Sequence, residues 1–235
     1  MSDTKILDNQ INKMTFWATI LIIAVGIAGS SLPLDAPSGT VLERVAWLSA
    51  NLHEFRLAWA LQMVAMLSLS VMFAGATWQI RSTHPLAAMI AGIALFGATM
   101  AFTIVKFIAF WSVPQMAEVA SAGSAGADIA LQLVTQWNVA TPFGLFSSLD
   151  YLGFWLYGVS GLFIACPLWR LSTAAKVAAV GFGAYGLLYN VMLLALFADA
   201  IVQADIGAYF DGIPGLLFFS IFGMLFHTRP GRSSE

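Results

Sequence analysis

Two charged residues stand inside long apolar stretches of the chain. Lys106 lies five residues before the end of the run 86–111, and Asp150 lies four residues into the run 146–169. A helix of about 20 apolar residues crosses the hydrocarbon core of a membrane, where an unpaired lysine costs about 3 kcal/mol or more. Since consecutive membrane helices run in opposite directions, the two side chains fall at matching depths. We therefore expect Lys106 and Asp150 to form an ion pair.

Four further polar residues are predicted at about the same level. Tyr189 and Asn190 lie in the outer half of the fifth apolar run, and Arg56 opens the second run at its outer boundary. Asp211 heads the sixth run, where a glycine and a proline follow closely and free backbone carbonyls. Together with the ion pair, these residues predict a polar pocket that opens outward and takes a ligand.

Three roles for Lys106 stay open at this stage. The pair with Asp150 can be a structural ion pair that only fixes the register of two helices. Alternatively, Lys106 extends to the outer lipid headgroups, or it takes part in ligand binding or proton transfer. Replacement of Lys106 by methionine separates these roles. A stable variant without function indicates the pocket, whereas a destabilised variant indicates the structural pair.

The composition indicates which elements must position these residues. Of 235 residues, 60% are hydrophobic and 9% are charged, whereas a soluble domain has about 25% charged residues. The chain is therefore predicted to be an all-α, polytopic membrane protein with a single domain, 1–235, embedded in the lipid bilayer. The net charge of −2, without a Lys/Arg cluster, predicts no nucleic-acid partner. The six-helix transmembrane bundle is expected to consist of the spans 14–34, 56–78, 86–111, 146–169, 173–198 and 210–226.

A short helix on the membrane surface is predicted in the first loop. Thr40 and Glu43 have the spacing of a capping box, in which the two residues satisfy each other's backbone N–H groups at a helix start. The residues that follow form an apolar stripe at helical spacing, as an interfacial helix requires. This stripe consists of Val41, Leu42, Val45 and Leu48.

Prolines and an aspartate set the expected ends of helices around the third span. Pro85 fits the first turn of this span, and Pro114 is expected to close its aromatic end. In the long loop that follows, Asp128 is a good N-cap for a second surface-lying or re-entrant helix. One face of this helix is predicted to carry Ile129, Leu133 and Trp137.

The distribution of basic residues predicts how the chain is inserted. With the N-terminus inside, seven lysines and arginines fall on the inner side and two on the outer side, which satisfies the positive-inside rule. We expect a multi-pass protein of the cytoplasmic membrane with both termini in the cytoplasm. Trp59 and Trp111 are expected to mark the outer boundary. Lys13 followed by a short apolar segment also fits a signal peptide, so cleavage of the first span stays open.

Motifs of the familiar membrane enzymes are missing from the sequence. It contains no HExxH, no GxSxG and no glycine-rich phosphate loop. His53 with Glu54 is a weak acid–base candidate, and a hydrated loop pair explains it as well. His84 and His227 lie at inner helix ends without further ligands, and the single Cys166 excludes an internal disulfide and a cysteine metal cage. We therefore predict no metal, no cofactor and no catalytic residue.

The segment SANLHEFRLAWALQMVAMLSLSVMFAGATW, residues 49–78, resembles the corresponding part of the domain-of-unknown-function 4386 family of short bacterial membrane proteins. The resemblance rests on Ala50 and Asn51 in the first outer loop and on Arg56 and Leu57 at the start of the second span. The order of the spans and the total length agree as well. The resemblance implies a six-helix integral membrane protein and brings no known activity or catalytic residue.

Three classes of function remain. The leading interpretation is a non-enzymatic protein, either a binding module for a small or lipid-like molecule or an accessory subunit packed against other membrane proteins. The alternative is a proton-coupled small-molecule transporter, for which intramembrane lysine and aspartate are typical residues. The third is an enzyme that acts on a lipid or isoprenoid, with Asp150 or Asp211 as the base and Lys106 as the electrostatic stabiliser.

Overall fold

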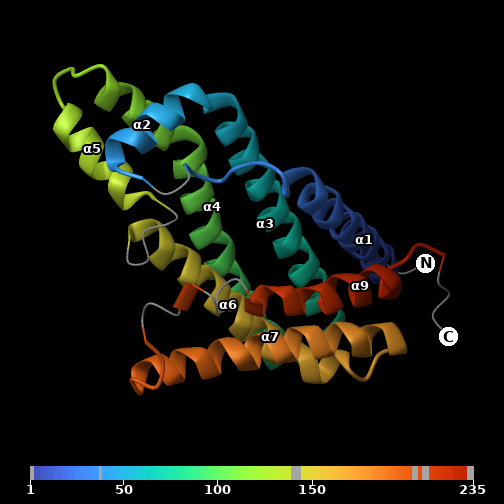
Figure 1. Cartoon of the computed structure of the whole chain (residues 1–235). Coiled ribbons are helices and arrows are strands. Elements are labelled where there is room, and N and C mark those ends of the chain that lie inside the picture. Colours follow the sequence, from blue (N-terminus) through green and yellow to red (C-terminus); the bar gives the residue numbers. More distant parts are fainter. Residues whose placement is uncertain (1–2, 37–38, 139–143, 203–205, 208–211, 232–235) are drawn as a thin grey trace. The chain divides into compact units, whose positions relative to one another are not determined.

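The computed structural model describes residues 3–36, 39–138, 144–202, 206–207 and 212–231. Within these ranges the regular structure is helical, which confirms the predicted all-α class (Figure 1). The main helices are α1 (Asp3–Gly29), α2 (Val41–Ala50), α3 (Leu52–Ile80), α4 (Pro85–Ser121), α5 (Ala127–Gln136), α6 (Leu145–Leu168), α7 (Thr173–Phe197), the 3-10 turn η2 (Ile213–Leu216) and α9 (Leu217–His227).

Five of these helices are long and apolar enough to cross a membrane, namely α1, α3, α4, α6 and α7. The shortest, α6, has 24 residues and a length of about 36 Å, which exceeds the hydrocarbon thickness of about 30 Å. The protein is therefore a helical membrane protein. The segment Ile213–His227 is also apolar but spans only about 22 Å as a helix. The count of six spans consequently stays a prediction.

Helix α4 begins as predicted and ends later than predicted. Pro85 is its first residue, where the missing N–H of proline would have no helical partner anyway. The expectation that Pro114 closes the helix is wrong, because α4 continues through it to Ser121. Val113 and Ala117, on either side of Pro114, are almost fully buried in a hydrophobic cluster. This burial offsets the single backbone hydrogen bond that proline removes.

The start of α5 differs from the prediction at Asp128. The N-cap is Gly126, in the left-handed region at φ 94°, and Asp128 lies inside the first turn. Glycine adopts this conformation without the clash that a Cβ would cause, so the backbone turn fixes where the helix starts. Asp128 still stabilises the helix, because its carboxylate lies near the positive end of the helix dipole.

The predicted capping box at the start of α2 is confirmed. The backbone N–H of Glu43 donates to Thr40 Oγ1 over 3.3 Å, and the backbone N–H of Thr40 donates to Glu43 Oε2 over 2.6 Å. The Thr40 backbone N–H and the Thr40 hydroxyl both donate to the Glu43 carboxylate and hold the pKa of Glu43 below its ordinary value, the backbone bond contributing most. The helix thus begins where the sequence places it.

The described chain forms two compact units. Unit 1 consists of Met1–Ile23, Leu67–Thr99 and Gly153–Glu235, and unit 2 consists of Ala24–Met66 and Met100–Leu152. Helices α1, α3, α4 and α6 each contribute one part to each unit.

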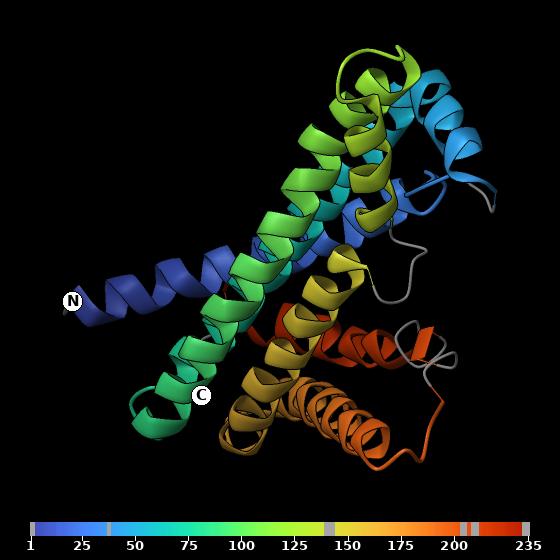
Figure 2. The same cartoon turned by 90° about the vertical axis from the view of Figure 1, so that its left-hand side faces the viewer.

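In unit 1, α7 and α9 lie side by side (Figures 1 and 2). Gly223 of α9 faces the backbone of Ala178 so closely that an added Cβ would overlap the Ala178 nitrogen. Ser220 Oγ, one turn earlier on α9, donates to the Ala178 carbonyl over 3.2 Å. Gly181 of α7 also faces α9, because a Cβ added to it would lie 2.6 Å from the backbone nitrogen of Ser220.

Unit 1 also contains a chain of hydroxyl groups between helices. Tyr157 Oη and Ser70 Oγ lie 2.6 Å apart, and Thr99 donates to Ser70 Oγ over 2.9 Å. A buried hydroxyl without a partner costs about 1 to 3 kcal/mol, so these contacts favour one packing arrangement of α3, α4 and α6 within the unit.

Unit 2 is organised around an aromatic and aliphatic core. Helices α2 and α5 lie close together in it, as Figures 1 and 2 both show. The buried residues come from α2, α3, α4, α5 and α6, and include Val45, Leu48, Phe55, Trp59, Val105, Val113, Val134, Trp137 and Phe146. This core holds the charged residues described next.

Candidate functional site

The structure brings Lys106 of α4 and Asp150 of α6 together in unit 2. Lys106 Nζ lies 2.6 Å from Asp150 Oδ1 and 2.9 Å from Oδ2, so the ammonium contacts both carboxylate oxygens. The Lys106 side chain is 5% exposed and the Asp150 side chain 16% exposed. This is a buried ion pair with short, charge-assisted hydrogen bonds.

Three aromatic rings surround the same ammonium. Lys106 Nζ lies 5.4 Å from the ring centroid of Trp59, 5.3 Å from that of Phe102 and 5.4 Å from that of Phe146. Each distance falls within the range of about 6 Å in which the face of an aromatic ring attracts a cation. We call Trp59, Phe102 and Phe146 the aromatic cage. Lys106 is therefore held by one carboxylate and three rings.

Helix periodicity places two of the cage residues. Phe102 precedes Lys106 by four residues on α4, and Phe146 precedes Asp150 by four residues on α6. Residues four apart lie on the same face of a helix, so each charged residue has an aromatic residue one turn N-terminal to it. This spacing is a signal in the sequence that could have identified the cage.

The third cage residue, Trp59, is almost fully buried within unit 2. Its expected position at the outer membrane boundary stays a prediction. Its indole N–H donates to the Leu34 carbonyl over 3.0 Å, and its ring packs edge-on against Phe146 at 5.1 Å. A buried indole needs such a partner for its N–H, and the Leu34 carbonyl supplies it.

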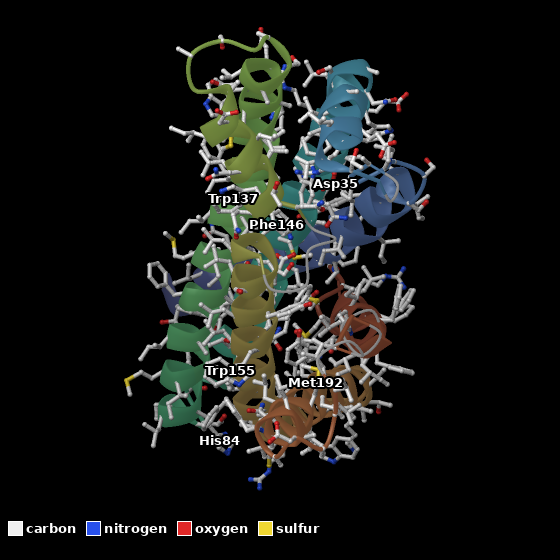
Figure 3. All side chains as sticks on the ribbon, turned by 60° about the vertical axis from the view of Figure 1, so that its left-hand side comes forward. Asp35, His84, Trp137, Phe146, Trp155 and Met192 are labelled. Atoms are coloured by element: carbon white, nitrogen blue, oxygen red, sulfur yellow. The ribbon has the colours of Figure 1, made fainter. Side chains whose placement is uncertain are left out.

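Phe146 connects the cage to the rest of the unit 2 core. Its ring centroid lies 6.4 Å from that of Trp137, which follows α5 (Figure 3). Aromatic pairs at this distance and in edge-to-face orientation stabilise a core beyond the area that they bury. The cage is thus a fixed part of the core rather than a group of flexible surface rings.

A second buried ion pair lies in unit 2, between Arg44 of α2 and Asp35. Arg44 Nε lies 2.7 Å from Asp35 Oδ1, and Nη2 lies 2.7 Å from Oδ2. The guanidinium also donates to the carbonyls of Val134 and Trp137 at the C-terminal end of α5. These carbonyls carry the negative end of the helix dipole and have no partner within the helix. Arg44 therefore joins Asp35, α2 and α5.

The role of Arg44 was not predicted, although its position in the sequence carries one signal. Arg44 lies three residues after Val41 and four before Leu48, so it belongs to the stripe that was expected to be apolar. An arginine on the buried side of a short helix needs a carboxylate and further acceptors. Asp35 in the preceding loop is one such acceptor, but the α5 carbonyls give no signal in the sequence.

The remaining predicted pocket residues lie in different parts of the chain, and a pocket that they share with the ion pair stays a prediction. Arg56 is exposed, and among the described residues the ion-pair partner of Asp150 is Lys106. Tyr189 and Asn190 belong to unit 1, where Asn190 donates to the Gly186 carbonyl over 2.8 Å and accepts a hydrogen bond from Trp155. Asp211 lies outside the described residues.

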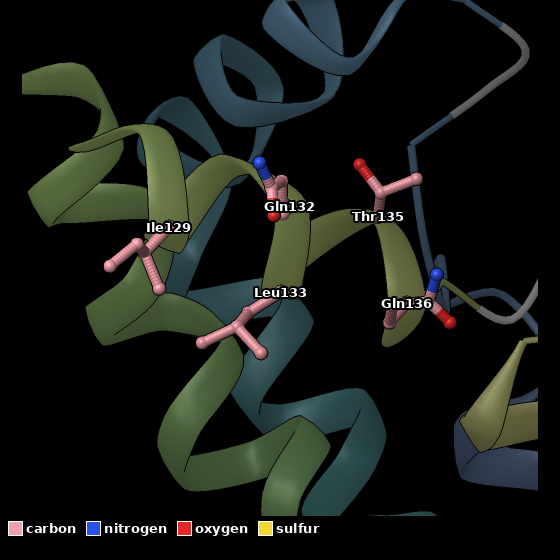
Figure 4. A pocket seen from close by; sticks show the side chains of 5 residues that line it. All are labelled: Ile129, Gln132, Leu133, Thr135 and Gln136. Carbon is pink, nitrogen blue, oxygen red and sulfur yellow. The ribbon is translucent and has the colours of Figure 1, made fainter. Parts of the chain in front are cut away.

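The surface of unit 2 is hollowed on α5 (Figure 4). This shallow hollow has a volume of about 350 Å³, and none of the predicted pocket residues lines it. It is formed by Ile129, Gln132, Leu133, Thr135 and Gln136. Ile129 and Leu133, predicted on one face, are both exposed, while the buried side of α5 carries Ala130 and Val134.

The two buried ion pairs and the aromatic cage are suited to binding charged groups. No cluster of three or more His, Cys, Asp or Glu side chains suited to a metal occurs in the described part of the chain. His227 contacts the Ser172 hydroxyl and the Gln79 amide oxygen through its two ring nitrogens. Lys106 and Asp150 would each have to leave the other before either acted as an acid or a base.

Comparison with known proteins adds no relative. No protein-family profile matches the chain, and no curated protein or solved structure shows significant similarity to it.

Proposed function

We propose that this membrane protein is non-enzymatic and acts as a binding or accessory subunit, and that unit 2 is the part that binds the partner. Its partner is a lipid-like or small molecule, or another membrane-protein subunit. The observation that carries the proposal is the closed Lys106–Asp150 pair. Both carboxylate oxygens and three aromatic rings contact one ammonium, which is an arrangement that holds a charge in place.

The second buried ion pair supports the same proposal. Arg44 and Asp35 tie α2 and α5 to each other, so the exposed face of α5 stands on a rigid base. A preorganised surface loses less conformational entropy when a partner binds to it. The hollow lined by Gln132, Leu133 and Gln136 offers both apolar and hydrogen-bonding contacts on this surface.

The topology is part of the proposal. We place the protein in the cytoplasmic membrane with six spans, counting Ile213–His227 as the sixth, and with both termini in the cytoplasm. The excess of lysine and arginine in the inner segments supports this orientation. In it, α2 and α5 are interfacial helices on the outer side. Membership of the domain-of-unknown-function 4386 family agrees with this layout and is proposed with it.

Purification tests the binding function directly. The wild-type protein is extracted in a mild detergent, and the lipids, small molecules and proteins that remain bound are identified by mass spectrometry. We expect one bound species near stoichiometric amount, and its loss after Gln132→Ala together with Leu133→Ala. An unchanged composition in this variant would contradict α5 as the binding surface. A lipid that accumulates after deletion of the gene would indicate an enzyme instead.

A proton-coupled carrier is the second candidate function, and the unequal exposure of the ion pair favours it. Asp150 is 16% exposed while Lys106 is 5% exposed, so the carboxylate reaches the surface of unit 2 and the ammonium does not. Such a pair can exchange a proton on one side of a barrier. In proteoliposomes, a carrier would show substrate uptake that depends on a pH gradient and disappears in Asp150→Asn. Uptake without such a dependence would exclude proton coupling.

A further inference from the structure

We infer that the aromatic cage and Asp150 form a binding site for an organic ammonium ion, which Lys106 occupies as an internal substitute. This inference rests on the proposed binding role of unit 2 and adds to the α5 surface a second, internal site, whose ligand is an organic ammonium ion. A carboxylate together with three aromatic faces is the arrangement by which proteins recognise alkylammonium and quaternary ammonium groups. Here it surrounds Lys106 Nζ, with centroid distances of 5.3 to 5.4 Å.

The aromatic cage makes more contacts with the ammonium than a structural lysine needs. A lysine that only neutralises Asp150 requires the carboxylate contacts at 2.6 and 2.9 Å. The three rings come from three different helices, α3, α4 and α6, and converge on one point. Convergence from three helices forms a site whose shape is independent of the lysine that fills it.

Access to the site comes from the side of Asp150. Its side chain keeps 16% of its surface exposed, whereas Trp59, Phe102 and the ammonium of Lys106 are almost fully buried. An incoming cation would therefore meet the carboxylate first and then replace the Lys106 ammonium between the rings. Two ammonium ions repel each other, so one carboxylate in a buried site holds only one of them.

Removal of the internal substitute tests the site. Lys106→Ala deletes three carbons and the ammonium, so n-propylammonium has the size and charge of the missing atoms. We expect this ion to raise the Tm of the purified full-length variant by about 5 to 10 °C at a hundredfold excess over its Kd. The uncharged analogue n-propanol should raise it far less. A folded Lys106→Ala protein that propylammonium stabilises no better than propanol does would overturn the inference.

Two controls locate the binding. Lys106→Ala with Asp150→Asn lacks the carboxylate, so the effect of propylammonium should disappear. Arg81→Ala removes a cation from the ion pair with Asp8 in unit 1, which lies beside one aromatic ring and not in a cage. This variant should gain no propylammonium binding. A shift of equal size in it would show a general salt effect and contradict a specific site.

The wild-type protein and a second variant complete the test. In the wild type the tethered ammonium competes, so propylammonium must bind at least tenfold more weakly than to Lys106→Ala. Equal affinity would place the ligand elsewhere. Lys106→Met keeps the aliphatic stem and fills the core if the alanine variant fails to fold. In it, ammonium chloride should raise the Tm more than sodium chloride at equal ionic strength, and equal effects would overturn the inference.

The natural ammonium group can belong to a free molecule or to a lipid headgroup, and reconstitution separates the two sources. Lys106→Ala is placed in vesicles of phosphatidylglycerol alone or mixed with phosphatidylethanolamine. Weaker propylammonium binding in the mixed vesicles indicates a lipid headgroup, and equal binding indicates a free ligand. Failure of every ammonium probe alongside a bound species in the purified wild type would refute the ligand class and leave the binding function standing.

Discussion

The guanidinium of Arg44 contacts both carboxylate oxygens of Asp35 at 2.7 Å, and both side chains are buried. The remaining N–H groups of Arg44 cap the C-terminal carbonyls of α5, so one side chain satisfies a carboxylate and a helix end. The planar guanidinium is suited to this double role, because its donors point in several fixed directions.

Arg44→Met should destabilise the protein strongly. It leaves the Asp35 carboxylate and two α5 carbonyls buried without a donor, which costs about 3 to 5 kcal/mol. Arg44→Lys should recover only part of this loss, because an ammonium lacks the fork that reaches both sets of acceptors. Denaturant unfolding in detergent measures the difference. The matched control is Arg56→Met, an exposed arginine of the same unit, which should stay within about 0.5 kcal/mol of the wild type. Equal losses of stability at both positions would refute the stabilising role of the Arg44 contacts.

Lys106→Met should destabilise the protein by about 3 to 5 kcal/mol, since it leaves the Asp150 carboxylate without its partner. This loss would show a structural role of the pair, and a role in binding needs the double variant to be shown. Lys106→Met combined with Asp150→Leu removes both charges and should recover most of the stability. Thermal unfolding followed by circular dichroism compares the three proteins. A single variant as stable as the wild type would show that the ion pair contributes little. Loss of bound ligand in a stable double variant would then assign the pair to binding.

The Lys106–Asp150 contact was predictable because both residues lie one turn or slightly more inside the outer ends of the predicted spans 86–111 and 146–169, which run in opposite directions. Depth in a membrane helix follows directly from residue number. The α2 start was predictable for a similar reason, since Thr40 and Glu43 are local in sequence. Local patterns of this kind need no knowledge of the tertiary structure.

The features that escaped prediction depend on distant packing. Pro114 stays helical because its neighbours are buried, and that burial is invisible in the local pattern. Trp59 resembles an interfacial anchor in sequence, yet the Leu34 carbonyl, 25 residues earlier, gives it a buried partner. The α5 carbonyls that bind Arg44 are backbone groups, which every residue carries. No side-chain pattern marks them.

Gly223→Ala should weaken the packing of α9 on α7. The new Cβ would overlap the backbone nitrogen and Cα of Ala178, which cannot rotate away, so α9 must shift at a cost of about 1 to 3 kcal/mol. Gly92→Ala is the control, because no atom lies within 4 Å of its added Cβ. This helical position should gain up to about 1 kcal/mol from the better helix former. Thermal unfolding of both variants measures the contrast, and destabilisation at both positions would point to a general effect of alanine.

The capping box should make the start of α2 sensitive to acid. The pKa of Glu43 is lower in the folded protein than in the unfolded chain, so its contribution to stability is complete above the unfolded pKa and is lost as the pH falls through the folded one. Unfolding of the wild type and of Glu43→Gln is compared from pH 7 to pH 3. We expect the wild type to be more stable at pH 7 and the difference to shrink once the pH falls below the unfolded pKa of about 4.3. A difference of the same size at pH 7 and at pH 3 would contradict the role of the charge.

The partners in the buried ion pair are made at different times. Lys106 and Asp150 are 44 residues apart, so a ribosome that adds about 5 to 20 residues per second makes the lysine roughly 2 to 9 s before the aspartate. During this interval the newly made α4 carries an uncompensated ammonium, which makes its entry into lipid less favourable by about 3 kcal/mol. The arrival of α6 with Asp150 removes that penalty, so α4 becomes fully compatible with the membrane only after α6 is made.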